Sequence, residues 1–213
     1  MDATLQREEM VRAQLAGRGI RDALVLDAMR RVPRHEFIPQ AYRDAAYEDH
    51  PLPIGEEQTI SQPYIVAAML EQLALQAGDR VLEIGTGSGY VTALLAVLGA
   101  DVYSVERRAV LASGAEATLR RLGYSNVSIR VGDGRLGWSE YAPYHAILVS
   151  AATAEMPPPL FAQLREGGRM ILPVGPSSSQ ELRLITKIGG QAAVKLLEGC
   201  RFVPLVEGEA DRG

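Results

Sequence analysis

The sequence predicts an α/β protein with a mostly parallel sheet, an antiparallel edge and an N-terminal helical cap. From residue 80 onward, short apolar runs alternate with helical patterns, which is typical of parallel strands joined by helices. Near the end of the chain, two strand-like runs flank Gly189-Gly190, a spacing that predicts a hairpin with a two-residue turn. We therefore expect a cap over residues 1–79 and an α/β core over residues 80–213, together in one compact structural unit.

The cap is expected to contain three helices. Residues 4–17 place apolar side chains on one side and are followed by glycine. Asp22 predicts the N-cap of a second helix, which Pro33 ends. Residues 33–60 show no regular pattern, and a third helix is expected from about residue 62 to residue 75.

The core is expected to alternate strands with helices. The predicted helices cover residues 90–98, 108–121 and 158–165. The predicted strands cover residues 80–84, 101–106, 126–131, 146–149, 170–174, 181–188, 192–197 and 201–206. Alternation followed by a hairpin indicates a parallel sheet with an antiparallel edge.

Composition excludes several classes of function. The chain has 213 residues, 47% of them hydrophobic, and a net charge of −4. The sequence contains no stripe of basic residues of the kind that binds nucleic acid. It contains no apolar run that approaches the length of a membrane span, and no residues with the spacing of metal ligands. The single cysteine, Cys200, cannot form an internal disulfide and is expected to be a small core residue. We expect a cytoplasmic protein.

The most informative segment, residues 81–90, reads VLEIGTGSGY. An apolar strand runs into three alternating glycines, and a helical pattern follows. Glycine permits a tight turn and a close approach of a ligand, and open α/β sheets bind ligands at the carboxyl ends of their strands. The segment predicts a nucleotide-like cofactor held at Gly85, Thr86 and Gly87. A purely structural turn is the alternative.

Three acidic residues lie at the ends of three consecutive predicted strands or, for Asp133, directly after one, and they identify the kind of cofactor. The glycine spacing is one residue short of the dinucleotide fingerprint. Glu83 would repel a pyrophosphate but suits the cationic end of S-adenosylmethionine. Glu106 lies at the distance expected of a ribose-binding carboxylate, and Asp133 is placed to accept from the adenine amino group. Together these acids make the purely structural reading of the turn unfavourable.

Ser61 marks a second candidate site. It stands before a predicted helix with Pro63 in its first turn. The serine is either the N-cap of that helix or a polar group beside the cofactor, and the two roles do not exclude each other. His35, His50 and His145 show no triad or metal-ligand spacing.

The chain resembles protein-L-isoaspartate (D-aspartate) O-methyltransferases over residues 5–206. The matching segments are RGIRD (18–22), VPRHEFIP (32–39), LPIG (52–55), QTISQPY (58–64), residues 81–90, Val105-Glu106, GDG with Gly137-Trp138 (132–138), GGR (167–169) and FVPL (202–205). The QTISQPY segment is the most specific of these, because many methyltransferases share the glycine turn.

The resemblance implies a Rossmann-like S-adenosylmethionine-dependent methyltransferase with a seven-stranded sheet and an exchanged order of the last two strands. It implies methyl esterification of isoaspartyl or D-aspartyl carboxylates in damaged proteins and flexible peptides, with S-adenosylhomocysteine as product. The ester would then cyclise to a succinimide without the enzyme. The implied catalytic residue is Ser61. The implied cofactor residues are Glu83, Gly85, Glu106, Asp133 and Gly134, and we expect Ile60, Ser61 and Val206 to contact the acceptor.

Some positions depart from the family pattern. Glu57 replaces a common glycine, His145 an aspartate and Ser150 a threonine, and residues 206–211 replace a glycine-rich end. Three rival functions stay open: a methyltransferase of the same fold for one dedicated peptide, a nicotinamide-dependent oxidoreductase and a non-catalytic scaffold. We expect a monomer.

Overall fold

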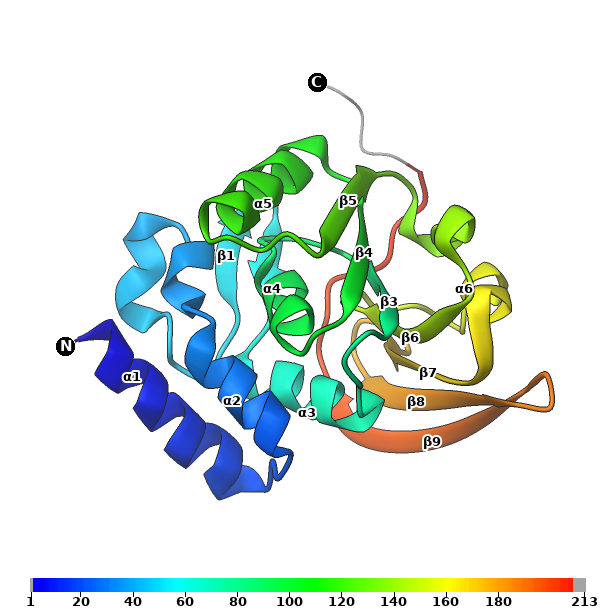
Figure 1. Cartoon of the computed structure of the whole chain (residues 1–213), viewed down its shortest axis with the longest axis horizontal. Helices are drawn as coiled ribbons and strands as arrows, with labels where there is room; N and C mark the ends of the chain where they lie inside the picture. Colours follow the sequence, from blue (N-terminus) through cyan, green and yellow to red (C-terminus); the bar gives the residue numbers. More distant parts are fainter. Residues whose placement is uncertain (1, 209–213) are drawn as a thin grey trace.

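A seven-stranded sheet forms the centre of the protein, whose computed structural model describes residues 2–208 (Figure 1). Its strand order is β5-β4-β3-β6-β7-β8-β9. The first five strands in this order pair in parallel, and β8 and β9 pair antiparallel at one edge. The predicted mostly parallel sheet with an antiparallel edge is therefore confirmed. The strands are β3 (Arg80–Ile84), β4 (Asp101–Glu106), β5 (Val127–Val131), β6 (Tyr144–Val149), β7 (Leu164–Val174), β8 (Gln180–Ile188) and β9 (Gln191–Cys200).

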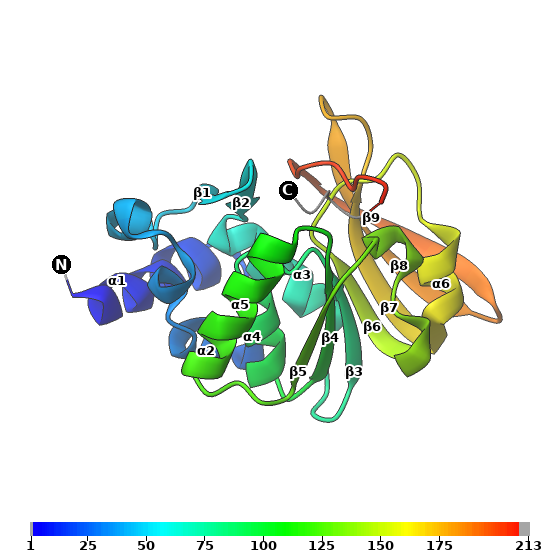
Figure 2. The same ribbon diagram turned by 90° about the horizontal axis from the view of Figure 1, so that it is seen from above.

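Helices cover the two faces of the sheet unequally (Figure 2). On one face α3 packs on β7, α4 on β4 and α5 on β5, and α2 packs outside α3 and α4. On the other face α6 packs on β7. The helices are α1 (Ala3–Glu9), α2 (Ala23–Arg31), α3 (Pro63–Leu73), α4 (Tyr90–Val97), α5 (Ala109–Arg121) and α6 (Pro158–Gln163). The cap therefore adds a second helical layer to one side only.

The buried strands alternate between two apolar clusters. Val81 and Leu148 belong to the cluster beneath the helical layers, whereas Leu82 and Ile147 belong to the cluster beneath α6. This period of two follows from the pleat of a strand. Glu83 occupies the same face of β3 as Val81, so its side chain points toward α4 rather than α6.

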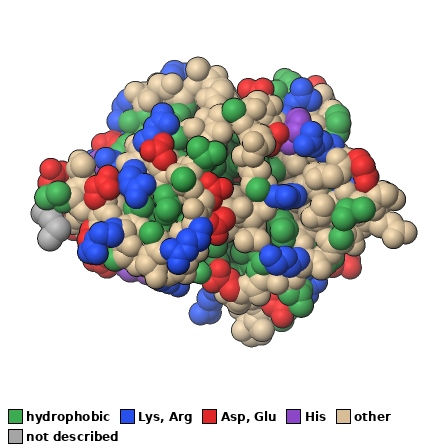
Figure 3. Space-filling model, turned by 60° about the horizontal axis from the view of Figure 1, so that its bottom comes forward, with side chains coloured by type: hydrophobic (Ala, Val, Ile, Leu, Met, Phe, Trp, Pro, Cys, Tyr) green, Lys and Arg blue, Asp and Glu red, His purple; other side chains and the backbone are tan. Residues whose placement is uncertain are grey.

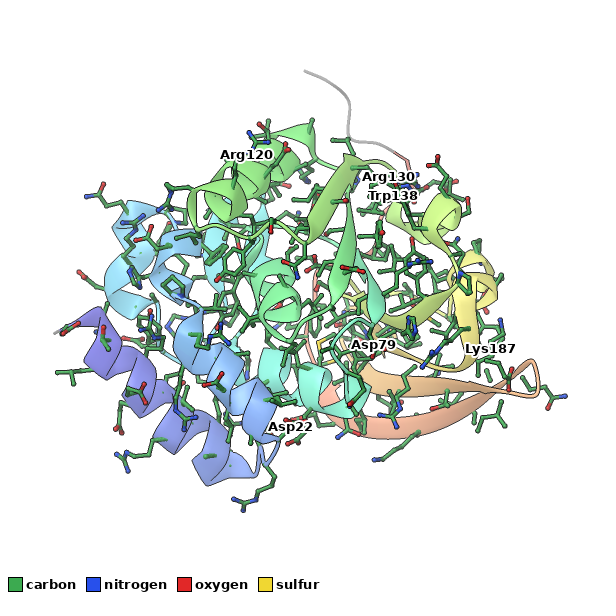
Figure 4. The ribbon with its side chains drawn as sticks, viewed as in Figure 1. Asp22, Asp79, Arg120, Arg130, Trp138 and Lys187 are labelled. Carbon is green, nitrogen blue, oxygen red and sulfur yellow. The ribbon has the colours of Figure 1, made fainter. Side chains whose placement is uncertain are left out.

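The first two helices begin and end close to the predicted positions. α1 continues through a π-helical segment, Met10–Leu15, and a 3₁₀ turn, Ala16–Arg18. Asp22, labelled in Figure 4, precedes α2. Its carboxylate accepts from the backbone N–H groups of Leu24 and Val25. The predicted N-cap at Asp22 is therefore confirmed.

A β-hairpin lies where the sequence shows no regular pattern. β1 (Leu52–Gly55) and β2 (Gln58–Ile60) pair antiparallel. Their turn places Glu56 and Glu57 at φ values of 52° and 56°. This left-handed conformation favours glycine, so two glutamates gave no hairpin signal. The expectation of an irregular segment was wrong here.

The strain at this turn predicts that Glu57→Gly stabilises the protein by about 1 kcal/mol, because a left-handed backbone costs a residue with a Cβ roughly that much. Urea unfolding measures the change. Glu57→Ala is the matched control, since it removes the carboxylate but keeps the Cβ. Equal stability of the glycine and alanine variants would contradict a backbone origin.

The expected strand over residues 201–206 is wrong. The chain leaves the sheet after β9 and crosses the end of β6, where Ala152 exchanges backbone hydrogen bonds with Val203 and Leu205 at 2.8 and 2.7 Å. Pro204, between them, has no N–H with which to continue a ladder. The segment therefore contributes to a cavity wall instead of an eighth strand. The expected helix over residues 158–165 also ends early, because β7 begins at Leu164.

Charged side chains of both signs are interspersed on the face shown in Figure 3. None of the helices within residues 2–208 is long and apolar enough to cross a membrane.

Cys200, expected in the core, is only partly buried at the end of β9. Burial raises the pKa of its thiol to about 11. The predicted tail over residues 207–213 lies mostly outside the described residues.

Candidate active site

A cavity of about 310 Å³ opens at the carboxyl ends of the parallel strands, a volume within the range of small-molecule sites. Its floor is the glycine turn after β3 and the start of the loop after β4. The β1–β2 hairpin forms one wall, and the C-terminal segment forms another. Figure 2 shows the hairpin and this segment at the same end of the sheet. The lining of the cavity includes residues 57–61, 84–88, 105–108 and 203–206.

The glycine turn has the backbone that the sequence predicts. Gly85, Gly87 and Gly89 adopt φ values of 89°, 53° and 87°, which residues with a Cβ rarely reach. Gly89 is the N-cap of α4, so the turn leads directly into that helix. Gly85, Thr86 and Gly87 all line the cavity. The structure thus places the three predicted turn residues where a ligand can meet their backbone.

Glu106 also lines the cavity, at the carboxyl end of β4. One carboxylate oxygen accepts from the backbone N–H of Gly87 at 2.9 Å, and the other accepts from that of Arg108 at 3.0 Å. The side chain is only 5% exposed. Its carboxylate is therefore held in one orientation, as a group that binds a diol requires. The ribose contact stays a prediction.

Asp133 and Gly134 follow β5, and only Gly134 lines the cavity. The Asp133 carboxylate accepts from the backbone and guanidinium of Arg135 and from the backbone N–H of Gly208. Burial alone would raise the pKa of Asp133, but these hydrogen bonds hold it below its usual range. A Cβ on Gly134 would lie 2.5 Å from Ile84, so glycine is required there. The adenine contact of Asp133 stays a prediction.

Glu83 lies behind the cavity wall rather than in its lining. Its Oε2 accepts from Thr92 and Ser104, each at 2.6 Å. Because Ser104 donates its only hydroxyl hydrogen to Glu83, Thr86 must be the donor in the 2.6 Å contact between Thr86 and Ser104. The buried carboxylate thus reaches the glycine turn through two hydroxyls. The contact of Glu83 with the cationic end of the cofactor stays a prediction.

Burial makes Glu83 a pH-sensitive group. Desolvation, with a smaller contribution from Glu106, raises its pKa from 4.5 to about 7, although the Ser104 and Thr92 hydrogen bonds lower it. Between these two values the folded protein keeps a proton that the unfolded chain has lost. The free energy of unfolding therefore contains a contribution from Glu83 that decreases as pH rises from 4.5 to about 7.

We predict that Glu83→Gln removes a pH dependence on the order of 3 kcal/mol over that window, since each pKa unit is worth about 1.4 kcal/mol. Urea unfolding at several pH values measures it as the difference between wild type and variant. Glu116→Gln, at an exposed position of α5, is the control. Parallel curves for wild type and Glu83→Gln would show that Glu83 has an ordinary pKa.

A second cavity of about 200 Å³ adjoins the first. Its lining includes Arg18, Tyr64 and the end of β9 with the residues that follow it. Four residues line both cavities: Thr59, Ser61, Ser150 and Val203. Ser61 therefore stands where a molecule in one cavity would meet a molecule in the other.

The N-cap reading of Ser61 is wrong. The N-cap of α3 is Gln62, and its side chain makes no capping hydrogen bond. The Asp49 carboxylate, distant in sequence, instead accepts from the backbone N–H of Tyr64 in the first turn, at 2.9 Å. It also pairs with Arg18. The Ser61 hydroxyl is consequently not needed as the cap of α3.

The other predicted acceptor residues, Ile60 and Val206, line the first cavity and not the second. Sequence reasoning missed Thr59 and Ser150 as residues of the junction. Ser150 follows β6, whose carboxyl end lies beside that of β3, so its position after a parallel strand was an available signal.

The histidines lie outside both cavities. Nδ1 of His145 accepts from the backbone N–H of Arg80 at 2.9 Å, a structural role. Nδ1 of His35 contacts the Tyr47 hydroxyl at 2.7 Å, and His50 pairs with Glu48 near the surface. The residues at the junction of the two cavities are hydroxyl-bearing or apolar.

Comparisons with known proteins identify the family. Residues 5–210 match the family model of protein-L-isoaspartate(D-aspartate) O-methyltransferase. The chain belongs to this family. It is 54% identical over 202 residues to protein-L-isoaspartate O-methyltransferase 1 of Syntrophobacter fumaroxidans, covering 94% of each chain. It is 54% identical to the protein-L-isoaspartate O-methyltransferase of Opitutus terrae, covering 94% of this chain and 87% of that one.

Solved structures show the same fold. A protein-L-isoaspartate O-methyltransferase with 34% sequence identity superposes with a TM-score of 0.86, over 94% of this chain and 66% of that longer chain. A family member from Plasmodium falciparum, in complex with S-adenosyl-L-homocysteine, has 28% identity and a TM-score of 0.84, over 94% and 98% of the two chains. The Rossmann-like methyltransferase fold and an S-adenosylmethionine-dependent activity follow, and an oxidoreductase is not favoured.

Proposed function

We propose that this chain methylates the free carboxylate of L-isoaspartyl and D-aspartyl residues in damaged proteins and flexible peptides. The observation that carries the proposal is the junction of the two cavities at Ser61. The donor would occupy the first cavity, beside Glu106 and the glycine turn. The acceptor would enter the second cavity, so the two reacting groups would meet beside Ser61.

The residues that line the first cavity fit S-adenosylmethionine. Glu106 presents a fixed carboxylate for the ribose hydroxyls, and the turn at Gly85–Gly87 lets a ligand approach the backbone. Gly134 brings the backbone next to Asp133 into the cavity lining, and we assign the adenine edge to this side of the cavity. The buried Glu83 supports the turn through Ser104 and Thr86. When bound, S-adenosylmethionine supplies an electrophilic methyl group.

The acceptor requires little help from acid–base chemistry. A carboxyl group with a pKa near ~4 is already ionised at neutral pH, so the site needs no general base. Its residues have to hold the carboxylate in line with the methyl group, which can account for roughly 7–11 kcal/mol of a barrier at best. We assign to the Ser61 hydroxyl a hydrogen bond that orients the carboxylate.

A repair assay tests the proposal. A peptide containing isoaspartate is incubated with the protein and S-adenosylmethionine, and the products are separated by mass spectrometry and chromatography. We expect the isoaspartyl peptide to decline while succinimide and normal aspartyl peptide appear. A stable methyl product on another residue would contradict repair. Transfer to one peptide sequence only would favour a methyltransferase with a dedicated substrate.

We also propose that the protein works in the cytoplasm as a monomer. The site supports the second part, because residues 2–208 of one chain supply every wall of both cavities described above. Size-exclusion chromatography with light scattering tests it. A stable dimer at micromolar concentration would contradict it.

A further inference from the structure

Arg34 carries a charge, and its side chain is fully buried. It begins a 3₁₀ turn, Arg34–Phe37, directly after the proline that follows α2. No ion pair joins it to a carboxylate among the described residues. Burying a cation without an anionic partner costs several kcal/mol of desolvation free energy. An apolar side chain would fill the same space without that cost, so packing alone does not explain an arginine at this position.

The hydrogen bonds of Arg34 supply that reason. Its Nε donates to the carbonyl of Ala46 at 2.8 Å, and its Nη2 donates to the carbonyl of Ser61 at 2.8 Å. The guanidinium lies over the ring of Tyr90, 4.8 Å from the ring centre. Tyr90 begins α4 and lines the first cavity. One rigid group therefore joins the cap, the start of α4 and the backbone of Ser61.

The planar geometry of the guanidinium group explains why this position requires arginine and not lysine. A guanidinium is planar, so fixing its Nε on Ala46 and its face on Tyr90 also fixes the direction of Nη2. Nη2 then fixes the carbonyl of Ser61 and with it the peptide plane that carries the serine side chain. A lysine keeps the charge in this space but has no second donor at a set angle.

We propose that Arg34 is a positioning residue for methyl transfer, which holds the backbone of Ser61 so that its hydroxyl meets the acceptor carboxylate. This inference rests on the proposed role of Ser61. Arg34 touches neither the acceptor nor the donor in this arrangement. Its effect passes through Ser61, and a misplacement of about 1 Å at a reacting group can cost roughly 100-fold in rate.

A double-mutant cycle tests the proposal. Arg34→Lys is made in wild type and in Ser61→Ala, and kcat, KM for an isoaspartyl peptide and the Kd of S-adenosylhomocysteine are measured. In wild type we expect kcat to fall at least about tenfold with KM and Kd changed less than about threefold. In the Ser61→Ala background we expect the same change to lower kcat by less than about twofold, because residues that act through one group are not additive.

Arg43→Lys is the matched control. Arg43 lies in the same part of the cap and donates to the carbonyl of Ile38 at 3.3 Å, away from the junction. It should leave kcat unchanged. Should Arg34→Lys fail to fold, Arg34→Gln gives the same comparison with a neutral side chain that keeps an N–H donor.

The possible outcomes test the positioning role of Arg34 separately from the role assigned to Ser61. If Ser61→Ala lowers kcat but the Arg34 change is fully additive with it, Arg34 acts through general stability and the positioning role is overturned. An unchanged kcat in Arg34→Lys alone overturns it as well. If Ser61→Ala itself leaves kcat unchanged, the role assigned to Ser61 fails, while methyl transfer to isoaspartate still stands as a separate result.

Discussion

Ser61→Ala is expected to lower kcat for an isoaspartyl peptide by about 10- to 100-fold, because the hydroxyl at the junction no longer orients the acceptor carboxylate. The Kd of S-adenosylhomocysteine should stay nearly constant, since Glu106 and the glycine turn are untouched. The melting temperature should also change little, because the N-cap of α3 is Gln62 and not Ser61. Steady-state kinetics measures kcat, and calorimetry measures both the Kd and the melting temperature.

The matched control is Ser139→Ala, which removes an exposed hydroxyl from a 3₁₀ turn away from both cavities. It should behave as wild type. If Ser61→Ala abolished cofactor binding instead of turnover, Ser61 would belong to the donor site, and the division of roles between the two cavities would be wrong.

Glu106→Ala is expected to weaken cofactor binding by about 10- to 100-fold, since a hydrogen bond to a charged group is worth about 1.5–3 kcal/mol. Two effects combine in this variant. The diol of the ribose loses its acceptor, and the backbone N–H groups of Gly87 and Arg108 lose theirs. Calorimetric titration with S-adenosylhomocysteine measures the Kd.

Two further variants serve as a graded comparison and a control. Glu106→Gln keeps the shape of the side chain and one acceptor oxygen, so its Kd should lie between those of wild type and alanine. Glu116→Gln removes a carboxylate that pairs with Arg120 on the surface of α5 and should leave the Kd unchanged. A wild-type Kd in Glu106→Ala would remove Glu106 from the donor site.

The parts of the fold that the sequence predicts depend on local signals. The buried strand before the glycines, the glycine turn and the N-cap at Asp22 each arise from residues next to one another in the chain. The position of Glu106 follows from the rule that parallel strands end at one edge of a sheet. These features required no knowledge of distant contacts.

The parts that the sequence did not predict depend on long-range contacts. Asp49 caps α3 from a loop 15 residues earlier, and Arg34 reaches Ser61 across 27 residues. The β1–β2 turn has glutamates where its backbone conformation favours glycine. The residue types typical of hairpin turns are therefore absent, and the sequence did not predict this hairpin. The segment after β9 has strand-like residues, but Pro204 and the end of β6 direct it across the sheet.

The most direct measurement is methyl transfer from labelled S-adenosylmethionine to two peptides that differ only in L-isoaspartate versus L-aspartate. We expect base-labile methyl ester on the isoaspartyl peptide and none on the aspartyl peptide. Equal labelling of both peptides, or label that resists base, would contradict an isoaspartyl carboxylate as the acceptor. Absence of transfer to either peptide, with S-adenosylhomocysteine still bound, would contradict the assignment of the second cavity to a general isoaspartyl acceptor.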